Sequence, residues 1–263
     1  MSESSYPRAR KRFGQNFLHD AGIIEAIIEA ISPEPGEHLV EIGPGRGALT
    51  APLLDRCNWL DVIELDRDLI PLLRKKLGNN PHLHIHEADA LRFDYRQLQK
   101  SDEMLRVIGN LPYNITTPLL FHLLEQASCI SDMCFMLQRE VVERMCAQPG
   151  TKQYGRLSVM LQHQCDAEQL FIVPPEAFDP APKVESAIVY LQPRRQRRGG
   201  NIDLKALNKV VTQAFSQRRK TIANTLKKLV TPEQIEQVGI DVSQRPETVT
   251  VEEFVALAAF VLP

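Results

Sequence analysis

The chain has 263 residues, of which 43% are hydrophobic and 24% charged, and its formal net charge is −2. This length and composition are typical of a globular protein with one large α/β domain and a smaller second domain. No apolar run is long enough to cross a membrane, no signal-peptide core is present, and the five cysteines include no C-x-x-C pair, so a cytoplasmic protein is expected.

The charge is unevenly distributed along the chain. Residues 193–263 hold 12 Lys and Arg against 7 Asp and Glu, whereas the remainder is acidic overall. A second basic segment near the N-terminus contains Arg10, Lys11 and Arg12. Two basic ends around an acidic body suggest local contact with a polyanion, although solvated surface helices explain such runs about as often.

The first elements are a basic arm over residues 1–19 and a helix over 20–31, with Asp20 as its expected N-cap. Apolar runs then predict strands at 38–43, 59–65, 82–87, 105–109 and 132–138. Helical patterns alternate with these strands at 47–56, 66–77, 116–127 and 139–147. This alternation predicts an α/β fold with a mostly parallel sheet and helices on both faces.

The rest of the chain predicts a change of architecture. A helix at 155–164 precedes two strands, at 168–173 and 184–191, which we expect to form a hairpin-like edge of the sheet. Residues 193–201 are polar, basic and glycine-rich, which indicates a linker. The expected domains are therefore an arm (1–19), an α/β domain (20–192), the linker (193–201) and a wholly helical domain (202–263).

Polar anchors follow the first three strands of the predicted sheet. Gly43 and Gly45 lie in a G-x-G-x-G turn, which differs from the dinucleotide motif G-x-G-x-x-G. Glu64 ends the next strand, where an acidic side chain can accept both ribose hydroxyls. After the third strand, Asp89 and Ala90 place a carboxylate where it can accept from the amine of adenine. Because no P-loop pattern is present, the best prediction is an adenosine ligand without phosphates, with a plain tight turn as the alternative.

The fourth strand ends in Asn110-Leu111-Pro112-Tyr113. Asn110 offers a carbonyl acceptor, Pro112 favours an extended Leu111, and Tyr113 offers a ring for stacking. These residues suit a planar base with an amino group, although Asn and Pro are also common in ordinary turns. Together with the adenosine site, they predict methylation of that amine by S-adenosylmethionine.

No metal is expected. His82, His84 and His86 alternate along one predicted strand, but no carboxylate or further histidine cluster accompanies them. They are therefore interpreted as the solvent face of an edge strand.

Seven segments occur in the order found in one enzyme family: FGQNFL (13–18), VEIGPGRGALT (40–50), VIELD (62–66), GNLPYNITTPLL (109–120), YGRLSV (154–159), FDPAPKVESAI (178–188) and FSQRRKTIANTL (215–226). From about residue 10 onward the chain resembles the ribosomal-RNA adenine N6,N6-dimethyltransferases of the KsgA type. The resemblance implies a Rossmann-like methyltransferase domain with a small all-α C-terminal domain. It also implies dimethylation of two adjacent adenosines in a terminal hairpin loop of small-subunit (16S) rRNA, within an immature subunit, and a role in subunit biogenesis.

The resemblance assigns roles by position. The S-adenosylmethionine contacts it implies are Asn16, Leu18, Gly43, Glu64, Asp89 and Asn110, to which the strand-end pattern adds Gly45 and Ala90. The implied target-base residues are Asn110, Leu111, Pro112 and Tyr113, with Phe178 at the pocket mouth. Arg46 replaces a leucine of one relative, and this position is expected to face outward without functional consequence.

RNA contacts are predicted at basic residues of both ends of the chain: Arg10, Lys11, Arg12, Arg218, Arg219, Lys220 and Lys227. A solvated helix face is the alternative for the C-terminal group.

Several other functions remain open. A large-subunit rRNA adenine methylase of the antibiotic-resistance type shares these motifs, and a non-catalytic RNA-binding assembly factor can share the fold. A DNA adenine methyltransferase uses a similar Asn-Pro-Pro-Tyr pocket, but the small helical domain offers little surface for duplex DNA. A NAD-dependent enzyme is disfavoured by the glycine spacing. The protein is expected to act as a monomer.

Overall fold

The computed structural model describes residues 16–57, 59–78, 80–100, 103–112, 114–217 and 219–261. The chain divides into two compact units: Met1–Arg139 with Gln169–Gln192, and Glu140–Glu168 with Pro193–Pro263. These units share a border at 192–193 with the expected domains. They differ at Glu140–Glu168, which joins the C-terminal helices. The four-part domain division stays a prediction.

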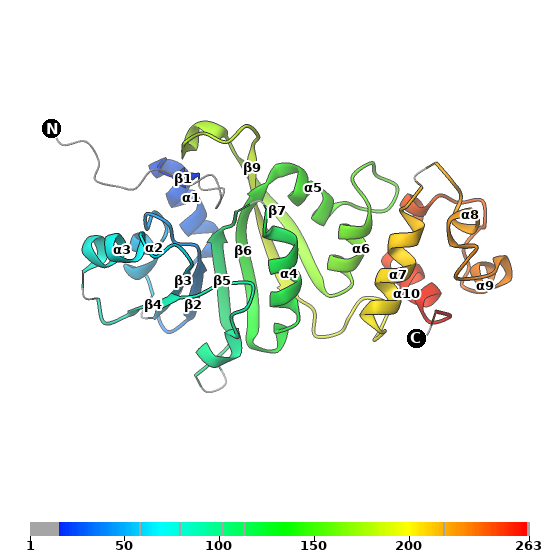
Figure 1. The fold of residues 1–263 in the computed structure, drawn as a ribbon, viewed down its shortest axis with the longest axis horizontal. Helices are drawn as coiled ribbons and strands as arrows, with labels where there is room; N and C mark the ends of the chain where they lie inside the picture. The colour runs from blue at the N-terminus through cyan, green and yellow to red at the C-terminus, as the bar shows by residue number, and fades with distance from the viewer. Residues whose placement is uncertain are drawn as a thin grey trace. The chain divides into compact units, whose positions relative to one another are not determined.

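Most of a seven-stranded sheet lies in the first unit (Figure 1). Its strands, in spatial order, are β4 (Leu83–Glu87), β3 (Leu60–Glu64), β2 (His38–Ile42), β5 (Leu105–Asn110), β6 (Ile130–Gln138), β9 (Ser186–Pro193) and β7 (Cys165–Val173). The pairs from β4 to β6 are parallel and β9 runs antiparallel to β6, so the expected α/β fold is confirmed. The two late strands are neighbours, with β7 at the edge.

Helices cover both faces of this sheet. They are α1 (Ala21–Ile31), α2 (Thr50–Leu54), α3 (Ile70–Leu77) and α4 (Thr116–Leu124). Ile27, Ile28 and Ile31 of α1 pack with apolar residues of β2, β3 and β6 on one face. The buried leucines of α4 do not belong to this cluster, and α4 lies in front of the sheet in Figure 1. Asp20 caps α1 as expected, because its Oδ1 accepts a hydrogen bond from the Ile23 N–H at 2.9 Å.

The strand order reverses between β2 and β5. The chain leaves β2 toward β3 and β4 and later returns on the other side of β2 as β5. At this point the two backbones lie very close, since a Cβ added to Gly109 would be 2.5 Å from the carbonyl oxygen of Ile42. Such a reversal opens a crevice at the carboxyl ends of the strands, where ligands bind in doubly wound folds.

A second, two-stranded sheet joins distant parts of the chain. In it β1 (Phe17–Leu18) pairs antiparallel with β8 (Phe178–Asp179). Its register places Phe17 opposite Asp179 and Leu18 opposite Phe178. The expected basic arm (1–19) thus includes two residues, Phe17 and Leu18, that are buried in this ribbon.

The histidines of β4 do not form a simple solvent face. His86 Nε2 lies 2.5 Å from Asp61 Oδ1, and the His84 ring stacks on Trp59 with centroids 4.0 Å apart. His38 Nε2 lies 2.6 Å from the other oxygen of Asp61. The alternation was recognised correctly, but the buried carboxylate of the neighbouring strand draws the side chains inward.

The second unit is mainly helical. Its helices are α5 (Arg139–Cys146), α6 (Arg156–Gln162), α7 (Leu204–Ala214), α8 (Ile222–Leu226), α9 (Pro232–Gln237) and α10 (Val251–Ala258). The first residue of α5, Arg139, still belongs to the first unit. Helices α9 and α10 begin with the capping boxes that the sequence predicts, Thr231 with Gln234 and Thr250 with Glu253. Within the ranges that the structure describes, no helix is long and apolar enough to cross a membrane.

Candidate active site

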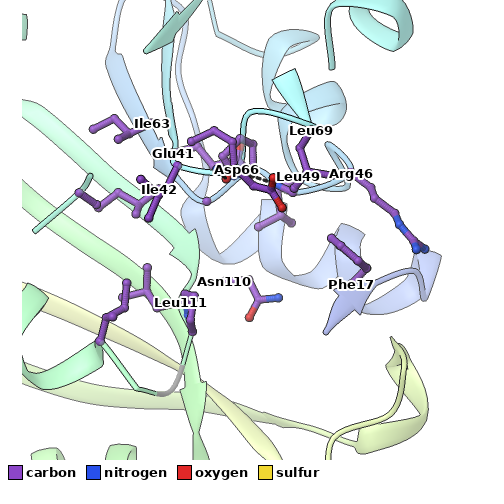
Figure 2. A pocket seen from close by; sticks show the side chains of 18 of the residues that line it. Phe17, Glu41, Ile42, Arg46, Leu49, Ile63, Asp66, Leu69, Asn110 and Leu111 are labelled. Carbon is purple, nitrogen blue, oxygen red and sulfur yellow. Dashed lines mark hydrogen bonds between the residues drawn. The ribbon is translucent and has the colours of Figure 1, made fainter. Parts of the chain in front are cut away.

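A pocket opens at the carboxyl ends of β2, β3, β4 and β5 in the first unit (Figure 2). It brings together ten of the predicted site residues: Asn16, Leu18, Gly43, Gly45, Glu64, Asp89, Ala90, Asn110, Leu111 and Pro112. These residues come from five segments separated by up to about a hundred positions in the sequence. Their convergence on one pocket supports the predicted link between an adenosine site and an amine site.

The glycine-rich turn forms one wall. Gly43, Gly45 and Gly47 have φ values of 67°, 57° and 72°, a region that residues with a side chain rarely adopt. Lys76 of α3 stabilises the turn, because its Nζ donates hydrogen bonds to the carbonyls of Arg46 (2.9 Å) and Gly47 (3.1 Å). The backbone can therefore approach a ligand closely and is held in place.

Glu64 lies at the end of β3, between the turn and the following segment. Its Oε1 accepts a hydrogen bond from the Asp66 N–H at 2.7 Å, and its Oε2 accepts one from the Gly45 N–H at 3.3 Å. Burial raises the pKa of Glu64, and these two N–H groups partly oppose that rise. The carboxylate is thus oriented by backbone donors at the position expected to bind ribose.

Glu41 is a pocket residue that the sequence interpretation missed. Its side chain is 2% exposed, and its Oε2 accepts a hydrogen bond from Thr50 Oγ1 at 2.6 Å. Burial raises its pKa to about 7; the Thr50 hydroxyl lowers it, and the negative charge of Glu64 raises it further. The signal was available, since Glu41 lies two residues before Gly43 of the glycine-rich turn. A glutamate inside an apolar strand is, however, easily interpreted as structural.

The charge of the pocket fits a cationic ligand. Glu41, Glu64, Asp66 and Asp89 line it, and Arg46 is the basic residue among its described lining residues. A phosphate group would face these carboxylates at a high electrostatic cost, whereas a sulfonium or ammonium would be attracted. Asp89 is oriented in turn by the Leu91 N–H, which donates to its Oδ1 at 3.0 Å.

Asn110 ends β5 and points into the pocket (Figure 2). Its Nδ2 donates a hydrogen bond to the backbone carbonyl of Asn16 at 3.2 Å, which directs Oδ1 away from β1. The carbonyl of Pro112 already accepts hydrogen bonds from the Ile115 N–H and from Thr116 Oγ1, both at 3.2 Å. A carbonyl has two lone pairs, so Leu111 offers the better second acceptor for an amine.

Two residues are placed differently from expectation. Phe178 is 4% exposed, packs in the core beside Leu18 and Ile188, and does not line the pocket. Its predicted stacking on a base stays a prediction, and it would require the ring to rotate out of the core. The expectation that Arg46 faces outward is wrong, because its side chain bends over Phe17 at the pocket mouth (Figure 2).

The remaining predicted residues form two groups. Tyr113, Arg10, Lys11, Arg12 and Arg218 fall outside the described residues. Arg219, Lys220 and Lys227 are exposed on the second unit. Their predicted RNA contacts are untested.

Comparison with known proteins identifies the family of this chain. A model of the family described as "Ribosomal RNA adenine dimethylase" matches residues 7–261. The chain belongs to the ribosomal RNA adenine dimethylase family. It is an S-adenosylmethionine-dependent enzyme, and S-adenosylmethionine is its methyl donor.

Curated relatives of the dimethylase match almost the whole chain. "Ribosomal RNA small subunit methyltransferase A" of Alcanivorax borkumensis is 58% identical over 252 residues, covering 95% of this chain and 89% of the relative. The protein of the same name from Pseudomonas aeruginosa is 56% identical over 258 residues, covering 98% and 96%.

Solved structures agree with the fold of the dimethylase. The 23S rRNA methyltransferase ErmE has a TM-score of 0.73 at 27% identity, covering 94% of this chain and 99% of its own. A dimethyladenosine transferase from Plasmodium falciparum has a TM-score of 0.76 at 24% identity, covering 92% and 95%, and supports the fold alone.

Proposed function

We propose that this dimethylase transfers methyl groups from S-adenosylmethionine to N6 of two adjacent adenosines in a terminal hairpin loop of small-subunit rRNA. We further propose that it acts as a monomer on immature small subunits in the cytoplasm and takes part in their biogenesis. The observation that carries the proposal is a single pocket lined by Glu64, Asp89 and Asn110, the residues that we expect to bind adenosine and to accept the amine. The names of relatives more than half identical to this chain support the small subunit as the substrate.

The pocket residues activate the amine by orienting it. Adenine N6 is a weak nucleophile because its lone pair is delocalised into the ring. With Oδ1 of Asn110 and the carbonyl of Leu111 accepting its two N–H bonds, the amine is held with its lone pair directed at the methyl group. S-adenosylmethionine supplies that methyl group on a sulfonium, which leaves as a neutral thioether. After transfer the methylated nitrogen carries the positive charge and releases a proton to solvent, so no strong base is needed before the attack. The residues of the pocket contribute preorganised dipoles and positioning.

The target adenosine must leave its base stack to reach this pocket. A nucleotide in a hairpin loop pays less for this than a paired one, since no base pair is broken. We therefore propose that the enzyme selects an unpaired adenosine of a loop, and that Tyr113 stacks on the base.

A second candidate is methylation of large-subunit rRNA. It is favoured by the likeness to ErmE, which covers 94% of this chain at 27% identity. The identity to the small-subunit enzymes is twice as high, which favours the first proposal. A non-catalytic assembly role is a third possibility that the same experiment addresses.

The test is transfer of labelled methyl groups to immature small subunits, naked small-subunit rRNA, large-subunit rRNA and duplex DNA, followed by nucleoside analysis. We expect N6,N6-dimethyladenosine in the small-subunit RNA and no label in DNA. Labelling confined to large-subunit RNA would support the second candidate. An absence of label on all substrates, with S-adenosylmethionine binding intact, would favour the non-catalytic role.

A further inference from the structure

Arg46 joins three segments at the mouth of the pocket. Its guanidinium carbon lies 4.0 Å from the centroid of the Phe17 ring, and its Nη1 lies 3.3 Å from Oδ2 of Asp179. The Arg46 side chain is 23% exposed, so both contacts are partly shielded from water. Arg46 thereby connects the glycine-rich turn to both strands of the β1–β8 ribbon.

The Phe17 ring also contacts the glycine-rich turn at Gly45. A Cβ added to Gly45 would lie 3.3 Å from Cδ1 of Phe17, so the ring rests against this glycine. The turn itself is held by Lys76, as described above. Phe17 is therefore fixed between the backbone of Gly45 and the guanidinium of Arg46, a cation–π arrangement.

Strand β1 begins one residue after Asn16, which contacts Asn110. The residue before Phe17 is Asn16, whose carbonyl accepts the hydrogen bond from Asn110 Nδ2. Figure 2 shows the nitrogen of the Asn110 amide directed toward the side on which Phe17 lies. An amide rotated by half a turn would present its NH₂ group to the substrate amine, which needs an acceptor and would find a donor.

We propose that Arg46 is a positioning residue for methyl transfer. By holding Phe17 and Asp179 together, it keeps the Asn16 carbonyl where it selects the productive orientation of the Asn110 amide. This inference rests on the proposed role of Asn110 in accepting the N6 amine. It predicts that loss of Arg46 slows the chemical step more than it weakens binding of rRNA.

The test uses single-turnover methyl transfer at saturating S-adenosylmethionine and immature small subunits. Arg46→Met keeps the bulk of the side chain but removes the guanidinium, and we expect the rate to fall roughly tenfold. Arg46→Lys keeps the charge and should recover part of that loss. Arg56→Met is the matched control, because Arg56 forms a partly exposed ion pair with Glu25 and does not line the pocket. A wild-type rate for Arg46→Met would overturn the proposal.

A double-mutant cycle shows whether Arg46 acts through Asn110. In an Asn110→Ala background, Arg46→Met should change the residual rate less than about twofold, because there is no amide to orient. A full tenfold effect in that background would overturn the proposed route. If Asn110→Ala itself keeps the wild-type rate, the proposed function of the amine site fails instead, so the two failures are distinguishable.

Hydrogen exchange provides a readout of the ribbon itself. The His19 N–H donates to the Ala177 carbonyl at 2.9 Å, next to the β1–β8 pair. Arg46→Met should speed exchange at this amide, whereas Arg56→Met should not. Unchanged exchange together with a slower rate would show that Arg46 acts by another route and would overturn the inference.

Discussion

Glu41 and Asp61 are buried carboxyl groups on neighbouring strands, and their pKa values are shifted in opposite directions. The difference follows from the hydrogen-bond donors around each group. Glu41 has the Thr50 hydroxyl as its hydrogen-bond donor, so burial dominates and its pKa is raised. Burial also acts on Asp61, but the hydrogen bonds from His38, His86 and Trp59 outweigh it and lower the pKa below its usual range. The number of donors within reach decides the charge state of each group.

The protonation of Glu41 should make cofactor affinity depend on pH. A sulfonium in the pocket favours the ionised carboxylate, so binding near pH 7 should release a proton and affinity should rise between pH 6 and 8. Glu41→Gln should flatten this dependence, since glutamine can still accept from Thr50 but does not titrate. Calorimetry in buffers of different ionisation enthalpy measures the released proton.

The same group should affect stability with a defined sign. The pKa of Glu41 is raised from 4.5 to about 7. Its contribution to the stability of the protein without cofactor is therefore fully present below pH 4.5 and is lost as the pH rises through 7. Glu41→Gln should therefore be more stable than the wild type above pH 7, by up to about 3 kcal/mol. Glu29→Gln, at an exposed position of α1, is the matched control. A wild-type pH slope in Glu41→Gln would contradict the assignment.

At the scale of elements, the close approach of the paired strands β2 and β5 leaves no room for a side chain at Gly109. Gly109→Ala would place Cβ 2.5 Å from the Ile42 carbonyl, so the two strands would have to separate. We expect destabilisation of roughly 1–3 kcal/mol and a marked loss of methyl transfer, since Asn110 is the next residue. Urea unfolding and a single-turnover assay measure the two effects.

Gly22→Ala is the control for the replacement of glycine by alanine at a site with more room. A Cβ at Gly22 meets Asp20 Oδ1 at 3.4 Å, which is ordinary contact, and alanine favours the helix. This variant should be as stable as the wild type or slightly more stable. If Gly109→Ala behaves like Gly22→Ala, the two strands do not constrain each other as described.

Most of the sheet could be predicted from the sequence because its signals are local. Apolar runs such as that of β5 mark buried parallel strands, and the capping boxes at Thr231 and Thr250 mark helix starts. The ends of α2 and α3 were predicted less well. Gly47 has a positive φ that a helix cannot contain, and α3 begins only at Ile70, with Pro71 in its first turn.

The parts of the site that sequence reasoning missed depend on contacts between distant segments. A strand of two residues, such as β1, has no periodicity to recognise, and its partner β8 lies far along the chain. The burial of Phe178 and the inward turn of Arg46 both follow from that pairing. The strand-end residues Glu64, Asp89 and Asn110 were recognised because parallel strands always present their carboxyl ends at one edge.

At the scale of the whole molecule, the basic residues predicted to bind RNA and the acidic residues of the pocket belong to different compact units. Arg219, Lys220 and Lys227 are exposed on the second unit, whereas the pocket carboxylates belong to the first. Replacing these three residues with alanine should weaken binding of small-subunit RNA. Each lost phosphate contact should lower the magnitude of the log-affinity against log-salt slope by about 0.7–0.9.

A salt titration of RNA binding measures this effect, with S-adenosylmethionine affinity measured in parallel. Cofactor affinity should not change, because the pocket is built by the first unit. Lys75→Ala, at an exposed position of α3, removes a charge from that unit and should leave the slope near the wild type. An unchanged slope in the triple variant would identify its cluster as a solvated surface.

The pairing of Phe17 with Asp179 has a consequence for synthesis of the protein. Chains emerge from the ribosome N-terminus first, so the residues of β1 are made long before β8 exists to receive them. The wall of the pocket formed by Asn16, Phe17 and Leu18 is therefore completed only after about two thirds of the chain has been translated. A nascent chain that stops before residue 178 can have its central parallel strands and still lack the β1–β8 pair beside the pocket. We therefore expect the pocket to be complete only late in synthesis, when Phe17 and Leu18 pair with Phe178 and Asp179.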